Sequence, residues 1–229
     1  MPYGKVMIFQ PITLHGAILH RIRTQEVQAR AQKQYGSITK DSPWMSDLGR
    51  RLNQLLDENA SSRSKFGKLT LLADEIASAV APHAGCRDNC AACCHISVAI
   101  SDHEAASIGA KVGLVPHRPP PNQEGEDLAK RYFRLPCPFV QDGRCSIYAH
   151  RPIACRLHFT LDKDAYFCQT TLEPDQSSVP NVDLTLFWHA YAMLSIQLGT
   201  RLGDIRQFFP SGLAARSTRK ELQNDTDDD

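Results

Sequence analysis

The chain has 229 residues, of which 42% are hydrophobic, enough for a domain with its own hydrophobic core. Lysine and arginine number 26 against 25 aspartates and glutamates, and this near balance argues against a broad electrostatic surface for nucleic acid or an anionic membrane. No run approaches the roughly 18 apolar residues that cross a bilayer, and the N-terminus lacks the basic start and cleavage site of a secretion signal. We therefore expect a cytoplasmic protein that neither enters a membrane nor binds nucleic acid.

Residues 1–45 show no sustained hydrophobic period and contain scattered glycines and prolines. This pattern predicts an N-terminal extension of low order. A natural start at Met45 is an alternative that would leave residues 1–44 outside the protein.

Helical spacing begins after this segment. Leucines at positions 48, 52, 55 and 56 predict a helix over residues 46–56, and apolar residues at positions 69, 72, 76 and 80 predict another over 65–80. Pro82 and Gly85 close the second helix. Residues 46–83 are therefore expected to form a helical flank before the cysteines.

Two further helices are predicted in the middle of the chain. Ser101 and Glu104 have the Ser-x-x-Glu spacing of a capping box, so a short helix should start at Ser101. The proline-rich stretch 115–125 reads as a surface loop, and residues 126–132 fit a helix.

The C-terminal part carries a strongly apolar helical pattern. Asp183 can cap a helix that ends at Gly199, and residues 171–210 should form a helical flank that packs on the core. His189 lies in this helix and receives no function, because such histidines are usually core residues. Residues 211–229 should form a disordered acidic tail.

Half of the eight cysteines fall within one short segment: Cys86, Cys90, Cys93 and Cys94. Thiolates so close together repel one another unless a cation neutralises them, and soft metals bind thiolates well. In a straight helix Cys86 and Cys94 would lie about 12 Å apart along the axis, too far to share one ion. We therefore expect either two metals, or a turn over Cys86–Cys90 with a helix starting at Cys93.

Two alternatives need no metal. Four disulfides could account for the eight cysteines, but a reducing compartment and a chain of this length disfavour them. Cysteines could also pack as small hydrophobic residues, which is a weak explanation for four of them in nine positions.

The second cysteine-bearing segment carries a hairpin signal, Asp142-Gly143 between two apolar runs. A two-residue loop would pair Val140 with Cys145 and send Cys137 and Cys145 to opposite faces. A three-residue loop would shift the pairing by one residue and place both thiols on one face. If both thiols bind one metal, the three-residue loop is predicted.

Beyond the hairpin, Pro152 suits the first position of a helix, with Cys155 in its first turn. Helix N–H groups, Arg151 and Arg156 would favour a thiolate there, although the arginines could instead form surface ion pairs. Cys168 reads equally as a ligand or as packing.

The motif Cys86-x3-Cys90-x2-Cys93-Cys94, followed by Cys-Pro-Phe and Asp-Gly-Arg-Cys-Ser-Ile-Tyr-x-x-Arg-Pro-x-x-Cys-Arg, resembles the zinc- or iron-chelating CxxCxxCC domain, the YkgJ-like cysteine-cluster family. The resemblance covers residues 84–170, with three residues rather than two after the first cysteine. It implies zinc or iron, including a 4Fe–4S cluster, as the bound group. The implied metal ligands are Cys86, Cys90, Cys93, Cys94, Cys137, Cys145 and Cys155, with Cys168 as an eighth.

Several functions remain open. Family members are often labelled iron–sulfur oxidoreductases, and a thiolate-rich site suits redox chemistry, whereas a non-enzymatic zinc site would stabilise the fold and present a surface to a protein partner. The spacing of Cys86, Cys90 and Cys93 also occurs in radical S-adenosylmethionine enzymes, but the chain lacks room for their barrel. A zinc module for nucleic acid is disfavoured by the charge balance. The expected fold is mainly α, with a small irregular cysteine-rich core that contains a β-hairpin.

Overall fold

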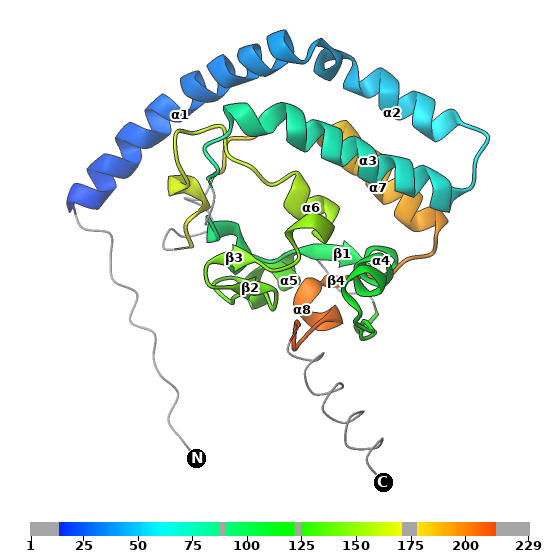
Figure 1. Ribbon diagram of the computed structural model, residues 1–229. Coiled ribbons are helices and arrows are strands. Elements are labelled where there is room, and N and C mark those ends of the chain that lie inside the picture. Colours follow the sequence, from blue (N-terminus) through cyan, green and yellow to red (C-terminus); the bar gives the residue numbers. More distant parts are fainter. Residues whose placement is uncertain (1–13, 88–89, 122–124, 171–177, 214–229) are drawn as a thin grey trace, which may run out of the picture.

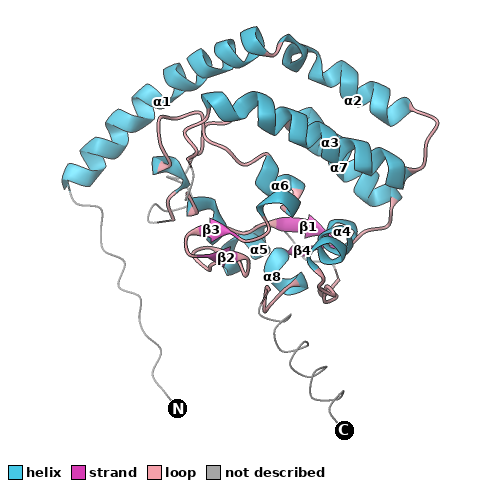
Figure 2. Cartoon of the chain, viewed as in Figure 1, coloured by secondary structure: helices cyan, strands magenta, loops and turns pink. Residues whose placement is uncertain are grey.

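The computed structural model describes residues 14–87, 90–121, 125–170 and 178–213. In chain order the helices are α1 (Leu14–Asp41), α2 (Leu48–Asp57), α3 (Ser62–Val80), α4 (Asp102–Val112), α5 (Gly125–Tyr132), α6 (Ile153–Arg156), α7 (Thr185–Gln197) and α8 (Ile205–Phe208). The strands are β1 (Ala99–Ser101), β2 (Val140–Gln141), β3 (Arg144–Cys145) and β4 (Leu202–Asp204). The predicted fold class, mainly α with a small hairpin-containing core, is confirmed (Figure 2).

The helices form an upper layer. Helices α1 and α2 follow one another in an arc above α3 and α7, which lie side by side (Figure 1). Helix α3 begins where the Ser61 hydroxyl accepts a hydrogen bond from the Ser64 N–H, and it buries Phe66, Leu69 and Ile76 between its neighbours. A continuous apolar stripe explains why sequence alone predicted α2 and α3.

Below this layer, two segments that are far apart in the sequence pair as strands. Strand β1 runs antiparallel to β4, with Ala99 opposite Asp204, and α4 and α8 pack beside them (Figure 1). The predicted capping box at the start of α4 is present, with Ser101 and Glu104 each bonded to the other's backbone. A second hydrophobic cluster forms here, and Cys137, Cys145 and Cys155 pack against it.

Most other element predictions are confirmed within a few residues, including α5 and α7. The Asp183 carboxylate accepts the Thr185 N–H at 2.9 Å, and Gly199 has φ +62° just beyond α7, the left-handed conformation of a helix C-terminus. The proposed segment boundaries stay a prediction, and most of the expected acidic tail, residues 214–229, lies outside the described residues.

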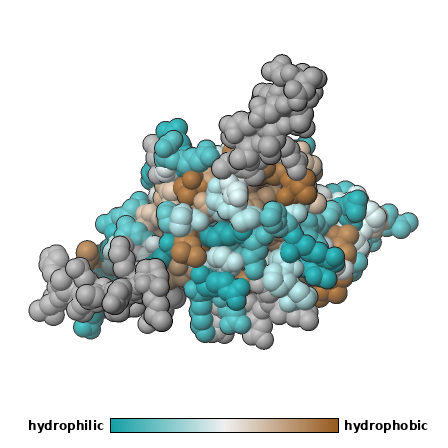
Figure 3. Space-filling model, turned by 90° about the horizontal axis from the view of Figure 1, so that it is seen from below, coloured by the Kyte–Doolittle hydropathy of each residue, from teal (hydrophilic) through white to brown (hydrophobic). Residues whose placement is uncertain are grey.

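The prediction of low order for residues 1–45 is wrong from residue 14 onward, because α1 occupies Leu14–Asp41. Among its described side chains, Val27 and Ile38 are the buried apolar ones, so the helix has almost no apolar stripe to detect. Within the described residues, no helix combines the length and hydropathy that a membrane span requires. Seen from below, the surface is mostly hydrophilic between separate hydrophobic patches (Figure 3).

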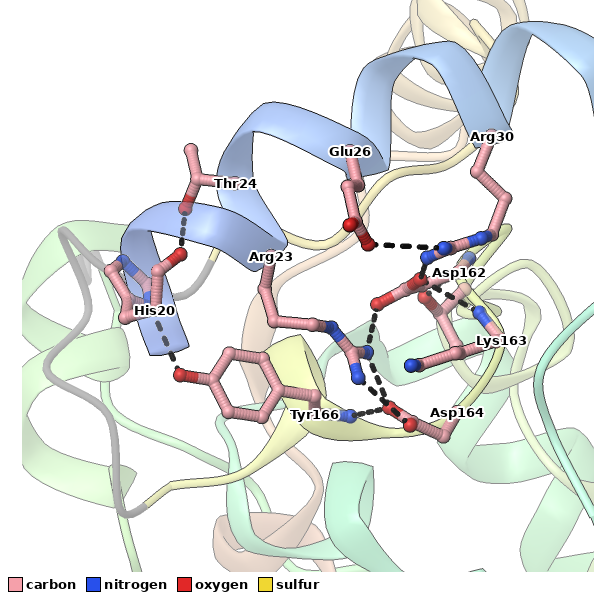
Figure 4. Close-up of polar contacts among 10 residues, drawn as sticks. His20, Arg23, Thr24, Glu26, Arg30, Asp162, Lys163, Asp164 and Tyr166 are labelled. Carbon is pink, nitrogen blue, oxygen red and sulfur yellow. Dashed lines mark hydrogen bonds and ion pairs between the residues drawn. The ribbon is translucent and has the colours of Figure 1, made fainter. Parts of the chain in front are cut away.

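Ion pairs attach α1 to the loop that precedes Cys168 (Figure 4). The Asp162 side chain is completely inaccessible to solvent and pairs with both Arg23 and Arg30. Arg23 also pairs with Asp164 at 2.7 Å and lies over the Tyr166 ring. Buried charges of this kind need partners, so α1 and the loop hold each other in place.

Replacing Arg23 by methionine should destabilise the protein. The variant leaves the buried Asp162 carboxylate with one arginine instead of two, and we expect the free energy of unfolding to fall by about 3 kcal/mol. Chemical denaturation would measure this change. Arg21→Met, at an exposed position of the same helix, is the matched control, and equal losses in the two variants would contradict the role of the buried pair.

Candidate metal centre

The first cysteine segment enters the site through a close backbone contact at Gly85. Its N–H donates to the Thr160 carbonyl at 2.7 Å, and a Cβ added at Gly85 would lie 2.3 Å from the Asp162 carbonyl oxygen. Only glycine allows this approach. A backbone hydrogen bond from Thr160 also reaches the Cys86 sulfur, so Cys86 lies against the loop that leads to Cys168.

The expected change of direction after Cys86 is present. The Cys90 N–H donates to the Arg87 carbonyl at 3.1 Å, which closes a turn, and a 3-10 helix spans Ala92–His95. The predicted helix start at Cys93 is therefore confirmed to within one residue, although the helix is 3-10 rather than α. Residues 88 and 89 lie outside the described part of the chain.

The hairpin that carries Cys145 has the shorter of the two loops considered. Val140 pairs with Cys145, and the loop residues Asp142 and Gly143 have φ of +49° and +71°, as a type I′ turn requires. The prediction of a three-residue loop, conditional on a shared metal, is wrong.

Cys137 nevertheless lies near Cys145, because it precedes the strand rather than belonging to it. The Val140 N–H donates to the Cys137 carbonyl at 3.0 Å, so the chain turns between them and strand alternation does not extend back to Cys137. The Cys137 N–H donates in turn to the Cys94 carbonyl at 2.6 Å. This bond joins the two cysteine segments directly.

Cys155 lies in α6, as predicted. Pro152 is the N-cap residue of this helix, and its carbonyl accepts the Cys155 N–H at 3.0 Å. The two neighbouring arginines have different roles. Arg156 pairs with Asp74 of α3, whereas Arg151 lies over the Tyr148 ring and close enough to Cys155 to lower its thiol pKa.

Cys168 ends a 3-10 helix, Tyr166–Cys168, and it is buried. Burial and the nearby thiols of Cys86, Cys93 and Cys90 raise its pKa to about 12. The structure therefore brings Cys168 to the first cysteine segment, although sequence alone left it undecided.

Burial opposes ionisation at most of these thiols and raises the pKa of Cys86, Cys137, Cys145 and Cys155. Cys93 differs, because a hydrogen bond from the Cys94 thiol lowers its pKa to about 7 and raises that of Cys94. Several charged sulfurs in this space require a cation nearby. Arg151 supplies part of this positive charge, since its contribution lowers the pKa of Cys86, Cys93, Cys145 and Cys155 against the opposing effect of burial.

The mutual influence of the thiols indicates two neighbourhoods. The first contains Cys86, Cys90, Cys93 and Cys168. The second contains Cys94, Cys137, Cys145 and Cys155. Cys93 also acts on Cys94, Cys145 and Cys155, so it lies where the two meet. Across the described ranges, no three cysteine, histidine, aspartate or glutamate side chains are arranged closely enough to hold one metal ion.

The donors in the two neighbourhoods fit a soft metal. They are sulfur atoms, and backbone hydrogen bonds from Phe139 and Ile147 reach the sulfurs of Cys137 and Cys145, each two residues earlier. Such N–H···S bonds stabilise negative charge on sulfur and tune thiolate-bound iron. Zinc and iron both match this donor set.

Arg206, which sequence analysis did not single out, braces both cysteine segments from α8. Its guanidinium donates to the carbonyls of Ile96 and Pro136, each at 3.1 Å, and lies over the Tyr132 ring. It also bonds to the Asp204 carboxylate at 2.9 Å. The Asp-x-x-Gln capping box at Asp204 was readable in the sequence, but the carbonyl partners of Arg206 carry no sequence signal.

Fold and site together define a mainly helical protein with a cysteine-based metal-binding module. Residues 85–171 match the family model CxxCxxCC, described as a "putative zinc- or iron-chelating domain". The match confirms the resemblance seen in the motifs and supports metal chelation. No curated protein and no solved structure matches the chain.

Replacing Arg206 by methionine should weaken metal retention without removing a cysteine. Loss of the bonds to the carbonyls of Ile96 and Pro136 would loosen both cysteine segments, and we expect metal affinity to fall by about tenfold or more. Competition with a coloured chelator would measure the affinity. The exposed Arg131→Met is the control, and unchanged affinity in Arg206→Met would contradict the bracing role.

Proposed function

We propose that the eight cysteines hold zinc or iron as thiolates and that this metal centre is the functional part of the protein. The observation that carries the proposal is the gathering of thiols from separate parts of the chain, with Cys94 bonded to Cys137 through the backbone and Cys86 placed against the Cys168 loop. Bringing such groups together costs free energy that a bound cation recovers.

The two thiol neighbourhoods support two four-thiolate sites, in which binding of the metal would draw the sulfurs closer together than they lie in the described residues. One would use Cys86, Cys90, Cys93 and Cys168, and the other Cys94, Cys137, Cys145 and Cys155. Four thiolates suit either a tetrahedral zinc ion or a 4Fe–4S cluster.

A redox role follows if the metal is iron. When bound, iron with thiolate ligands supplies one-electron transfer. Cys86 and Cys90 are exposed, whereas Cys168 is buried, so the first site has one side near the surface. An electron partner could approach that side, while Arg151 offsets negative charge within the site.

A structural zinc site is the second candidate, with the protein acting as an interaction module. The observation in its favour is the scarcity of regular structure around the ligands, since β2 and β3 have two residues each and α6 has four. A metal would then supply much of the order of residues 84–170.

Anaerobic purification followed by an absorption spectrum and elemental analysis of the same sample would decide between the candidates. Brown protein with iron and acid-labile sulfide would support the redox role, because sulfur-to-iron charge transfer is visible. Colourless protein with stoichiometric zinc would support the structural role. Metal-free protein with oxidised cysteines would overturn the proposal.

Serine variants test the division into two sites. We expect Cys168→Ser to lose the metal of the first site and Cys145→Ser that of the second, because an alcohol is a poor ligand for a soft metal. Metal analysis of each purified variant would show the loss, with Ala91→Ser as a control that retains both metals. Complete loss of metal in either variant would contradict two independent sites.

A further inference from the structure

A cleft separate from the thiols lies between α3, α4 and the chain around Pro152. It has a volume of about 280 Å³, and its polar wall includes His103, Ser107, Lys111 and Arg151. No cysteine lines it among the described residues. The metal proposal leaves this cleft without a role, and its volume suits a small organic molecule.

The permanent charges that face the cleft are mostly positive. Of its lining arginines, Arg156 is paired with Asp74 and also donates to the Arg151 carbonyl at 2.8 Å. Lys111 forms no ion pair or hydrogen bond with any residue that the structure describes. The Arg151 guanidinium lies over the Tyr148 ring, 4.0 Å from its centroid, and close enough to Cys145 and Cys155 to lower the pKa of both thiols. Lys111 therefore has no carboxylate partner among the described residues, and Arg151 has none there either, although it also lies near the thiols.

Glu104 is the acidic residue that lines the cleft, and it does not neutralise them. Its carboxylate is buried and accepts hydrogen bonds from the Ile153 N–H at 2.9 Å and the Tyr191 hydroxyl at 2.5 Å. Burial lowers the pKa of His103, and the charges of Arg63 and Asp102 shift that pKa in opposite directions, Arg63 lowering it and Asp102 raising it. The net charge available to a ligand is positive.

The cleft also has one polar and one apolar wall, which suits a small organic anion with an apolar part. His103, Ser107 and Lys111 recur every four residues and so lie along one face of α4. Phe66 of α3 and Ile153 form the apolar side. We propose that this cleft binds a small organic anion, whose carboxylate or phosphate group meets Lys111 and Arg151 while its apolar part lies against Phe66.

The anion would lie beside the metal centre. Arg151 lies between Cys145 and Cys155 in the sequence, and its charge acts on thiols of both neighbourhoods. Binding itself uses no cysteine, so the anion site does not depend on the proposed metal function. If the centre is redox-active, the cleft is where its substrate would bind.

Substitutions at Gly67 test binding in the cleft because they change its volume and leave its charged side chains in place. It lies within α3, lines the cleft, and a Cβ added there would have no atom within 4 Å. A glycine inside a helix is otherwise unfavourable, so Gly67→Ala should fold at least as well as the natural chain. Gly67→Leu should also fold, but its longer side chain would project into the cleft.

Calorimetric titration of the full chain with phenyl phosphate, benzoate and neutral benzyl alcohol tests the proposal. We expect saturable binding of one or both anions and none of the alcohol, and the tighter anion identifies the headgroup. Equal binding of all three compounds, or of none, would overturn the proposal.

The variants locate the binding. We expect Lys111→Glu and Gly67→Leu to weaken anion binding by about tenfold or more, because they remove a charge-assisted hydrogen bond or fill the space. Lys33→Glu, an exposed position on α1 with the same change in net charge, and Gly67→Ala should bind as the natural chain does. Metal content, measured on every sample, separates a failure of this site from a failure of the metal centre. Unchanged binding in Lys111→Glu and Gly67→Leu would place the anion elsewhere and overturn the assignment.

Discussion

Crowding of thiols is the constraint on which the rest of this structure depends. The eight cysteines fall in two adjoining thiol neighbourhoods, and burial raises the pKa of Cys86, Cys137, Cys145, Cys155 and Cys168. Neutral thiols could stay together as weakly polar packing groups, but thiolates could not do so without a cation. Arg151 offsets some of this charge through space, and a soft metal would offset the remainder through bonds.

Much of what holds the thiols in place lies outside the matched residues 85–171. Strand β4 pairs with β1 only after the last cysteine, and Arg206 next to it supports the carbonyls of Ile96 and Pro136. From the other end of the chain, Arg23 and Arg30 of α1 fix Asp162 in the Cys168 loop. Ion pairs and hydrogen bonds therefore link the helical layer to the cysteine core. A substitution that displaces one of these parts should also shift the backbone of the other.

Elements held by interactions between residues close in sequence could be predicted from the sequence, whereas elements held by distant residues could not. Helices α2, α3 and α4 carry periodic leucines or other apolar residues, and α3 and α4 also carry N-terminal caps; both are local signals. Helix α1 was missed because it buries few apolar side chains and because one of its attachments is an ion pair between Arg23 and Asp162, 139 residues apart. No local sequence pattern indicates an ion-pair partner so far away in the sequence.

The metal site shows the same division. Thiol spacing predicted the cysteines as candidate metal ligands, because closely spaced thiols are a local sequence feature that is typical of metal sites. The three-residue loop, predicted for a metal shared by Cys137 and Cys145, assumed strand alternation through Cys137, whereas a turn separates Cys137 from the strand. Asp142-Gly143 itself pointed to the two-residue loop that is present.

The turn also explains why Cys137 lies near Cys145 although the hairpin has the two-residue loop. A regular strand through Cys137 would have forced a choice between good pairing and shared ligation. By ending the strand at Val140, the chain keeps a tight hairpin and returns Cys137 to the side of Cys94. Irregular backbone before the hairpin thus keeps Cys137 close to Cys145, whereas regular alternation would send the two thiols to opposite faces.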